Sequence, residues 1–117
     1  MSTPDTSYPE IMSSCVDSCQ RCHQVCLDAA QRMLETPPSA GESNVFTALV
    51  TCIGLTRLTA EMALTDSGSH QSACELCAKA CKACAELCAG NPALANCVKA
   101  CLECAHCCLL AADQVGA

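Results

Sequence analysis

Cysteine is the residue in this chain whose type and spacing could support chemistry, because its thiolate is both a nucleophile and a soft metal ligand. The chain contains 15 cysteines among 117 residues. On a helix, runs with alternating steps of three and four residues stay within an arc of roughly 60–80°. The spacing therefore predicts three helices with thiols on the face that packs into a core. The three runs are Cys15, Cys19, Cys22, Cys26; Cys74, Cys77, Cys81, Cys84, Cys88; and Cys97, Cys101, Cys104, Cys108.

Composition leaves few other large side chains for that core. The hydrophobic fraction of 51% includes every cysteine, and the aromatic residues are Tyr8 and Phe46, with no tryptophan. Helices that meet along cysteine stripes face one another with small groups where close packing needs volume, so we expect something else to fill that space. Leucines between and around the stripes are expected to support helix packing even before that space is filled. They are Leu27, Leu49, Leu58, Leu76, Leu87, Leu102 and Leu109.

The charge balance argues against a nucleic-acid partner. The formal net charge is -6 with six basic residues, and these form no cluster. The first ten residues lack the basic start and apolar run of a secretory signal, and no stretch resembles a membrane span free of polar residues. We therefore expect a cytoplasmic protein without a membrane partner. In that reducing compartment, a cysteine-rich chain is more often metal-binding than disulfide-linked.

Helix start and stop signals divide the chain into four segments, expected at about 8–35, 43–65, 70–88 and 92–113. Linkers this short make neighbouring helices antiparallel. The sequence thus predicts an all-α, antiparallel up-down-up-down four-helix bundle with a cysteine-lined core, as a single domain over residues 1–117. The signals are a capping box of Ser7 and Glu10, a stop at Pro37 and Pro38, a cap at Ser69, the post-helical Gly90, and the cap of Asn91 with Pro92.

The second segment differs from the others because Cys52 is its only cysteine. Arg57 and Glu61 define its solvent face. Met62 lies on the opposite face and Met12 lies in register with the first cysteine run. Both are candidate thioether ligands, although methionine at such positions is more often core filler. The face opposite the charges is expected to be Ala48, Cys52, Leu55, Thr59, Met62 and Asp66.

Three explanations of the thiols fit the pattern poorly. Small buried cysteines are common, but that explanation suits Cys52 or Cys107 alone rather than three consistent stripes. A disulfide scaffold needs bridges that cysteines at i, i+3 or i, i+4 of one helix do not reach easily, and the count is odd. The CxxCxxC run ending at Cys107 suggests an iron–sulfur site, but Cys108 follows at once and no proline completes the ferredoxin pattern.

The remaining explanation is a metal ion with a filled d shell that is bound by thiolates. The two candidates are zinc and copper(I), which differ in charge. A zinc ion held by four thiolates carries a net charge of minus two, so several such sites would accumulate buried negative charge. Copper(I) is softer and monovalent. If each copper ion replaces one thiol proton and thiolates bridge neighbouring ions, the core stays neutral however many ions bind. Copper(I) is therefore the better fit to a continuous seam of cysteine.

The CxxxCxxCxxxC run from Cys15 to Cys26, together with the cysteine-lined third and fourth segments, resembles the bacterial cytosolic copper storage proteins. This is a family of cysteine-rich four-helix bundles, and the resemblance covers nearly the whole chain. It implies many Cu(I) ions inside each bundle and assembly as a homotetramer. The single cysteine of the second segment, Cys52, is a departure that leaves fewer ligands on that wall.

We therefore predict a copper(I) storage and buffering protein, not an enzyme. Its partners are copper ions, with copper chaperones or apo-cuproenzymes as candidate donors and recipients. A zinc or mixed-metal thiolate sink and a thiol redox buffer remain alternatives. The predicted ligands are Cys15, Cys19, Cys22, Cys26, Cys52, Cys74, Cys77, Cys81, Cys84, Cys88, Cys97, Cys101, Cys104 and Cys108, joined by Cys107 from the flank of its helix and by His70, Met62 and Met12.

The predicted copper entrance is the bundle end that holds the N-termini of the first and third helices. His70 extends the second cysteine run there and could hand copper inward. His23 and His106 lie off their stripes, so we expect His23 to be structural and His106 to be a surface or subunit-contact residue. The entrance collects Met12, Met62, Asp66, His70 and Cys108. The opposite end is the more apolar closure and collects Cys26, Met33, Val45, Cys88 and Leu94.

Overall fold

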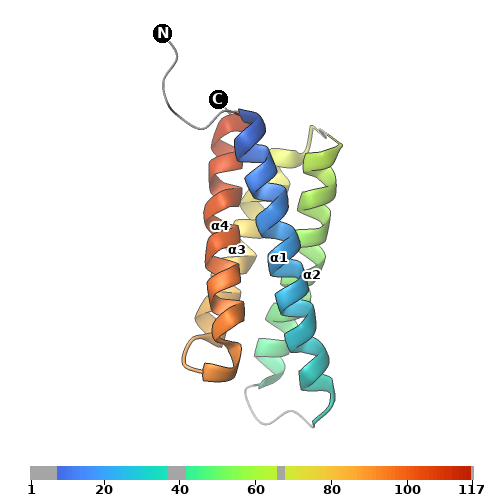
Figure 1. Cartoon of the computed structure of the whole chain (residues 1–117), viewed down its shortest axis with the longest axis vertical. Coiled ribbons are helices and arrows are strands. Elements are labelled where there is room, and N and C mark those ends of the chain that lie inside the picture. The colour runs from blue at the N-terminus through green and yellow to red at the C-terminus, as the bar shows by residue number, and fades with distance from the viewer. Residues whose placement is uncertain (1–7, 37–41, 66–67, 117) are drawn as a thin grey trace.

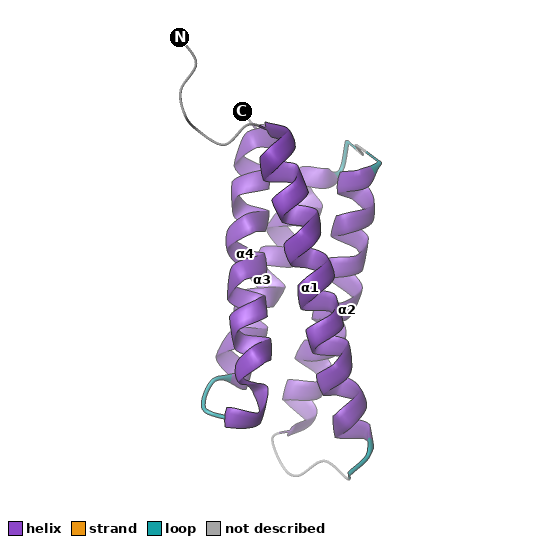
Figure 2. Ribbon diagram, viewed as in Figure 1, coloured by secondary structure: helices purple, strands orange, loops and turns teal. Residues whose placement is uncertain are grey.

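The chain folds into four long helices, described by the computed structural model over residues 8–36, 42–65 and 68–116. Helix α1 spans Tyr8–Leu34, α2 spans Glu42–Leu64, α3 spans His70–Cys88 and α4 spans Ala95–Gly116, with a short 3-10 turn at Pro92–Leu94. No strand occurs in these ranges (Figure 2). The four helices predicted from the sequence are confirmed.

The helices run alternately up and down around one core (Figure 1). Helix α1 packs beside α2 and α4, and α3 packs beside the same two helices. One end of the bundle therefore holds the starts of α1 and α3 with the ends of α2 and α4, as Figure 1 shows. The predicted antiparallel four-helix bundle is confirmed, and each helix presents one face to the shared interior.

The junction between α3 and α4 follows the signals in the sequence. Gly90 has φ 93°, in the left-handed region that favours glycine after a helix. The side chain of Asn91 then accepts a hydrogen bond from the backbone N–H of Ala93, at 3.0 Å. Pro92 opens a 3-10 turn instead of an α-helix, so α4 begins three residues later than predicted and extends to Gly116.

Two other start signals have different outcomes. Ser69 occupies the N-cap position of α3, but its side chain makes no capping hydrogen bond. Three other predictions fall on residues outside the described ranges. They are the capping box, through Ser7, the stop at Pro37 and Pro38, and the inward position of Asp66.

The interior consists of thiols and small side chains. Every cysteine except Cys107 has at most 1% of its surface exposed. Most other buried apolar residues are alanines, and the larger ones are Ile11, Leu49 and Leu94. Because sulfur and methyl groups fill the inward positions, the helices meet with little hydrocarbon between them.

Most of the leucines expected to support packing between and around the thiol stripes lie around them, on the outside of the bundle. Leu49 is buried and Leu27 is half-buried. The inward positions of α3 and α4 are already taken by cysteine and flanking alanine, so the leucines on these helices lie on the outside. The exposed ones are Leu58, Leu76, Leu87, Leu102 and Leu109, at 37–53% exposure.

Two helical stretches are long and apolar enough to cross a membrane by length and composition alone. They are Glu42–Leu64 and Pro92–Gln114. An 18-residue window in each has a mean hydropathy of 1.3 and 1.4, and 28% and 39% of that window is buried. Two such helices do not by themselves indicate a membrane protein, because helices that pack into the core of a bundle can have the same composition.

Candidate metal centre

The buried thiols form one continuous series through the bundle. Buried cysteines form five groups, and within each group all the sulfur atoms lie within 4.8 Å of one another. Successive groups share Cys108, Cys104, Cys22 and Cys101, so each group is joined to the next. We call the twelve cysteines of these groups the thiol column. The column consists of Cys15, Cys19, Cys22, Cys26, Cys52, Cys74, Cys77, Cys81, Cys84, Cys101, Cys104 and Cys108.

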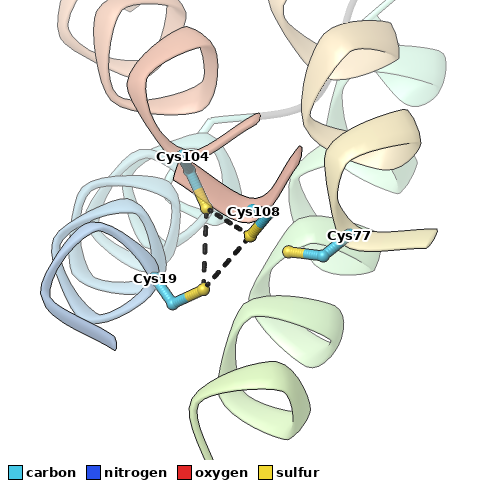
Figure 3. Close-up of side chains that lie close together, drawn as sticks. All are labelled: Cys19, Cys77, Cys104 and Cys108. Atoms are coloured by element: carbon cyan, nitrogen blue, oxygen red, sulfur yellow. Dashed lines mark hydrogen bonds between the residues drawn. The ribbon is translucent and has the colours of Figure 1, made fainter. Parts of the chain in front are cut away.

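One group contains four thiols and brings together three helices. Cys19 of α1, Cys77 of α3, and Cys104 and Cys108 of α4 form this four-thiol cluster, and all four are buried. Figure 3 shows their sulfur atoms pointing toward one another. The sulfur of Cys108 lies 3.7 Å from that of Cys19 and 3.9 Å from that of Cys104. A step of four residues places Cys104 and Cys108 one turn apart on the same face of α4. Cys19 and Cys77 face them from α1 and α3.

Sulfur spacing along the rest of the column suits shared metal ligands. The Cys22 sulfur lies 3.7 Å from that of Cys101, and the Cys26 sulfur lies 3.8 Å from Cys101. With a metal–sulfur bond of about 2.3 Å, two sulfurs on one ion are at most about 4.6 Å apart. All 15 cysteines are free thiols. The column can therefore accept soft metal ions with small side-chain movements.

At the end of the bundle that holds the starts of α1 and α3, a histidine continues the column. His70 is buried, with 2% exposure, and its Nε2 lies 3.1 Å from the sulfur of Cys74. Its Nδ1 is buried and has no hydrogen-bond partner among the described residues. A buried, unpartnered imidazole nitrogen is costly unless a ligand completes it, so His70 is available as a nitrogen ligand beside Cys15, Cys74 and Cys108.

At the opposite end, two buried cysteines lie outside the groups. The sulfur of Cys88 is 3.9 Å from that of Cys84, and the Cys97 thiol donates to the backbone carbonyl of Val25 at 3.8 Å. Leu94 is buried there and Met33 is half-buried. These side chains lie at the end opposite His70.

Crowding makes the thiols lose protons unevenly. A Cys108 thiol that donates to a Cys104 thiolate lowers the pKa of Cys104 below its ordinary value of 9.0. The same contact with Cys104, followed by the one with Cys15, raises the pKa of Cys108. Burial raises the pKa of Cys88 to about 12, and negative charge on Cys84 adds to this effect. Without metal, few of these thiols ionise together, because neighbouring negative charges repel.

The wall formed by α2 contributes little sulfur. Cys52 is buried, and its thiol donates to the backbone carbonyl of Ala80 at 3.5 Å. The Thr56 hydroxyl donates to the carbonyl of Cys52 at 2.6 Å, and the Thr59 hydroxyl donates to the carbonyl of Ala73 at 3.3 Å. Both threonines are fully buried. Their hydroxyls are hard donors that already have hydrogen-bond partners, so this wall is a poor surface for copper.

The predicted inner face of α2 was partly wrong. Leu49 and Thr56 are fully buried, whereas the predicted Ala48 and Leu55 are only half-buried. The true stripe is Leu49, Cys52, Thr56 and Thr59, which continues the three- and four-residue steps of the cysteine runs from Cys52. That periodicity was available in the sequence, but α2 also has apolar residues on its outer face, such as Val50, which obscured it.

The remaining predicted ligands lie at the edges of the column. Met12 and Met62 are half-buried, as is Cys107, which belongs to none of the thiol groups. His106 is exposed, as predicted. His23 is half-buried, and its Nδ1 lies 2.9 Å from the backbone carbonyl of Ile53.

The comparisons with known proteins agree with this geometry. The family model for copper storage proteins matches residues 8–113. A crystal structure of a protein from Nitrosospira multiformis is similar with a TM-score of 0.84 and 26% identity, over 91% of this chain and 98% of that one. The structure of the Cu(I)-bound copper storage protein BsCsp3 is similar with a TM-score of 0.80 and 27% identity, over 87% and 98%. No protein with a curated description is significantly similar in sequence.

The column of buried free thiols and a family match over almost all of the described bundle lead to the same result. The chain belongs to the copper storage protein family.

Proposed function

We propose that this protein stores copper(I) ions, many per chain, by binding them to thiolates along the bundle interior, and that its role is storage and buffering rather than catalysis. The observation that carries the proposal is the continuity of the thiol column, in which each group of thiols shares a member with the next. A bridging thiolate can serve two ions, so a continuous column holds more metal than separate sites of the same size.

The proposed ligands are the fourteen buried cysteines. Cys107, His70, Met12 and Met62 add donors at the edges of the column. The proposal is supported by the soft sulfur donors of the column and by the likeness to a Cu(I)-bound protein over most of the chain. Because each Cu(I) replaces one thiol proton, the buried charge stays near zero as ions accumulate.

Copper titration of the reduced, metal-free protein tests this function. With a competing Cu(I) chelator, we expect saturation at about one ion per cysteine, on the order of 15 per chain. Native mass spectrometry at fixed pH should show about one proton lost per ion bound. Saturation at three or four ions would contradict copper storage and would favour zinc, for which the four-thiol cluster supplies the preferred ligand number.

We also propose that copper enters at the end that carries His70. Its position next to Cys74 and its unpartnered Nδ1 support this choice. His70→Ala should slow copper loading in stopped-flow experiments while leaving the capacity almost intact, because the deeper thiolates are unchanged. Met33→Ala, at the opposite end, is the control. A normal loading rate in His70→Ala with slowed loading in Met33→Ala would place the entrance at the other end.

Assembly as a homotetramer in the cytosol is part of the same proposal. Exposed leucines support an interface: Leu76 and Leu87 lie on one face of α3, and Leu102 and Leu109 lie on one face of α4. The free thiols suit a reducing compartment. Native mass spectrometry should show four chains, and Leu76→Glu with Leu102→Glu should dissociate them. A monomeric wild-type protein would contradict the tetramer. Copper chaperones and apo-cuproenzymes are the proposed donors and recipients.

A further inference from the structure

A cleft of about 340 Å³ lies between α1 and α2, along the side of the bundle. Its buried lining includes Cys19, Thr56 and Ala60, and its exposed lining includes Arg57 and Glu61. The half-buried His23 also lines it. The cleft thus brings a histidine from the surface next to a cysteine of the four-thiol cluster.

The hydrogen bond of His23 fixes which ring nitrogen is free. Its Nδ1 lies 2.9 Å from the backbone carbonyl of Ile53, which can only accept, so Nδ1 carries the proton. In the neutral ring, Nε2 therefore has the lone pair, and no hydrogen bond to Nε2 occurs among the described residues. Metal-binding histidines are held in this way, with one nitrogen donating to a carbonyl and the other facing the metal.

The spacing of Cys19 and His23 suits a shared ion. They are four residues apart on α1, and side chains at that spacing have Cβ atoms about 5–6 Å apart. Bonds of about 2.0–2.3 Å to nitrogen and sulfur let one ion bridge the two. The residues of α2 beside Cys19 in the cleft, Thr56 and Ala60, are small. Cys19 has no exposed surface, so a small side-chain movement at this seam is needed to reach its sulfur.

We propose that this cleft is a lateral copper(I) site with His23 Nε2 and Cys19 Sγ as ligands. Copper reaches the four-thiol cluster through it without passing the bundle end. Binding releases the Cys19 thiol proton to solvent, leaves the proton on His23 Nδ1, and keeps copper in the +1 state. The volume lies within the range of small-molecule sites, so the donor at this lateral site is a low-molecular-weight Cu(I) complex, whereas copper chaperones are proposed for the bundle end. The proposal rests on the proposed storage function.

Substitution of His23 separates a ligand role from a structural role. The amide of His23→Asn can still donate toward the Ile53 carbonyl but offers no imidazole Nε2, whereas His23→Ala loses both. His106→Ala, an exposed histidine of α4, is the matched control. With Cu(I) supplied as a small chelator complex, we expect loading of both His23 variants to slow several-fold and His106→Ala to match the wild type. Adding His70→Ala to His23→Asn should slow loading further, because the two routes act in parallel.

Two direct readouts complete the test. Nitrogen-15 NMR of labelled histidine should show the His23 Nε2 resonance shifting with the first copper equivalents while Nδ1 keeps its proton. Total capacity should fall by no more than about one ion per chain, the single ion of this site. A His23→Asn variant that loads at the wild-type rate, or an unshifted Nε2 resonance, would overturn the lateral site. A wild-type protein that holds only a few ions would instead overturn the storage function itself.

Discussion

Helix α2 and the three cysteine-rich helices share one core but present different chemistry to it. Helices α1, α3 and α4 all supply free thiols to the four-thiol cluster. The sulfurs of α1 and α4 lie 3.7–3.9 Å apart there, and that of Cys77 on α3 lies within 4.8 Å of them. The inner stripe of α2 carries Leu49, Cys52, Thr56 and Thr59, and both threonine hydroxyls donate to backbone carbonyls. The threonine hydroxyls on the α2 wall therefore have hydrogen-bond partners without metal, while the other three walls have soft sulfur donors available for it.

The difference indicates a division between holding the fold and holding copper. Leu49 is the bulkiest of the fully buried side chains, and it comes from α2. The thiol walls pack by sulfur contact, which leaves ligands free to turn toward incoming ions. A core made of thiols alone would have to gain its packing from metal, so the polar and apolar wall of α2 allows the metal-free bundle to be helical.

The largest expected effect is a difference in amide hydrogen exchange between α2 and the three cysteine-rich helices when copper binds. Each bound ion stabilises the folded state by mass action, by about 2.7 kcal/mol per site at a free copper concentration one hundred times its Kd. Thiolate bridges join α1, α3 and α4, whereas α2 has only Cys52. Amide hydrogen exchange should therefore slow more in those three helices than in α2. Equal protection throughout would contradict the division, as would a random-coil circular dichroism spectrum for the reduced, metal-free protein.

Truncating the apolar part of α2 should affect the metal-free protein next most strongly. Leu49→Ala removes a fully buried side chain, and such changes cost about 2–5 kcal/mol. Chemical denaturation of the reduced protein measures this loss. Because no thiol is removed, copper capacity should stay unchanged. The exposed Leu58→Ala on the same helix is the control and should have little effect on either quantity.

A smaller effect is expected for alkaline pH. Burial raises the pKa of Cys88 to about 12 from 9.0. The stabilising contribution of Cys88 is complete below pH 9, where its thiol is protonated in both the folded and the unfolded protein. It is lost between pH 9 and 12, because this thiol ionises first in the unfolded chain. The advantage of the wild type over Cys88→Ala should fall by about 1.4 kcal/mol per pH unit in that window. Leu87→Ala is the control without an ionisable group, and parallel curves for all three proteins would refute the shift.

The smallest expected effect is a single added ligand. Thr59→Cys places a thiol on the α2 stripe next to the buried thiols of the other helices, and should raise the copper capacity by about one ion. Thr47→Cys, on the exposed side of α2, is the matched control and should not. Native mass spectrometry of the saturated proteins resolves this difference. An unchanged capacity in Thr59→Cys would mean that the α2 wall limits copper by geometry rather than by its lack of sulfur.

Sequence reasoning worked best where the periodic signal was strong. The cysteine steps in α1, α3 and α4 identified the inward face at every position, and Gly90 with Asn91 marked the α3 boundary. It was weakest for α2, where apolar residues surround the helix and the buried stripe was assigned to Ala48 and Leu55 instead of Leu49 and Thr56. The sequence also left open which leucines lie between the stripes and which lie outside them, and thiols and alanines leave no inward position for most of them.

The sequence alone determined the four helices, their antiparallel order and the faces that carry sulfur, because these depend on periodicity and on short linkers. The tertiary structure decided which thiols meet. The sulfurs of Cys19, Cys77, Cys104 and Cys108 come from three different helices, and their grouping depends on the axial offset of one helix against another. The same holds for His23 and Ile53, whose hydrogen bond joins α1 to α2. Periodicity sets the rotation of each helix, but only packing sets its height relative to its neighbours.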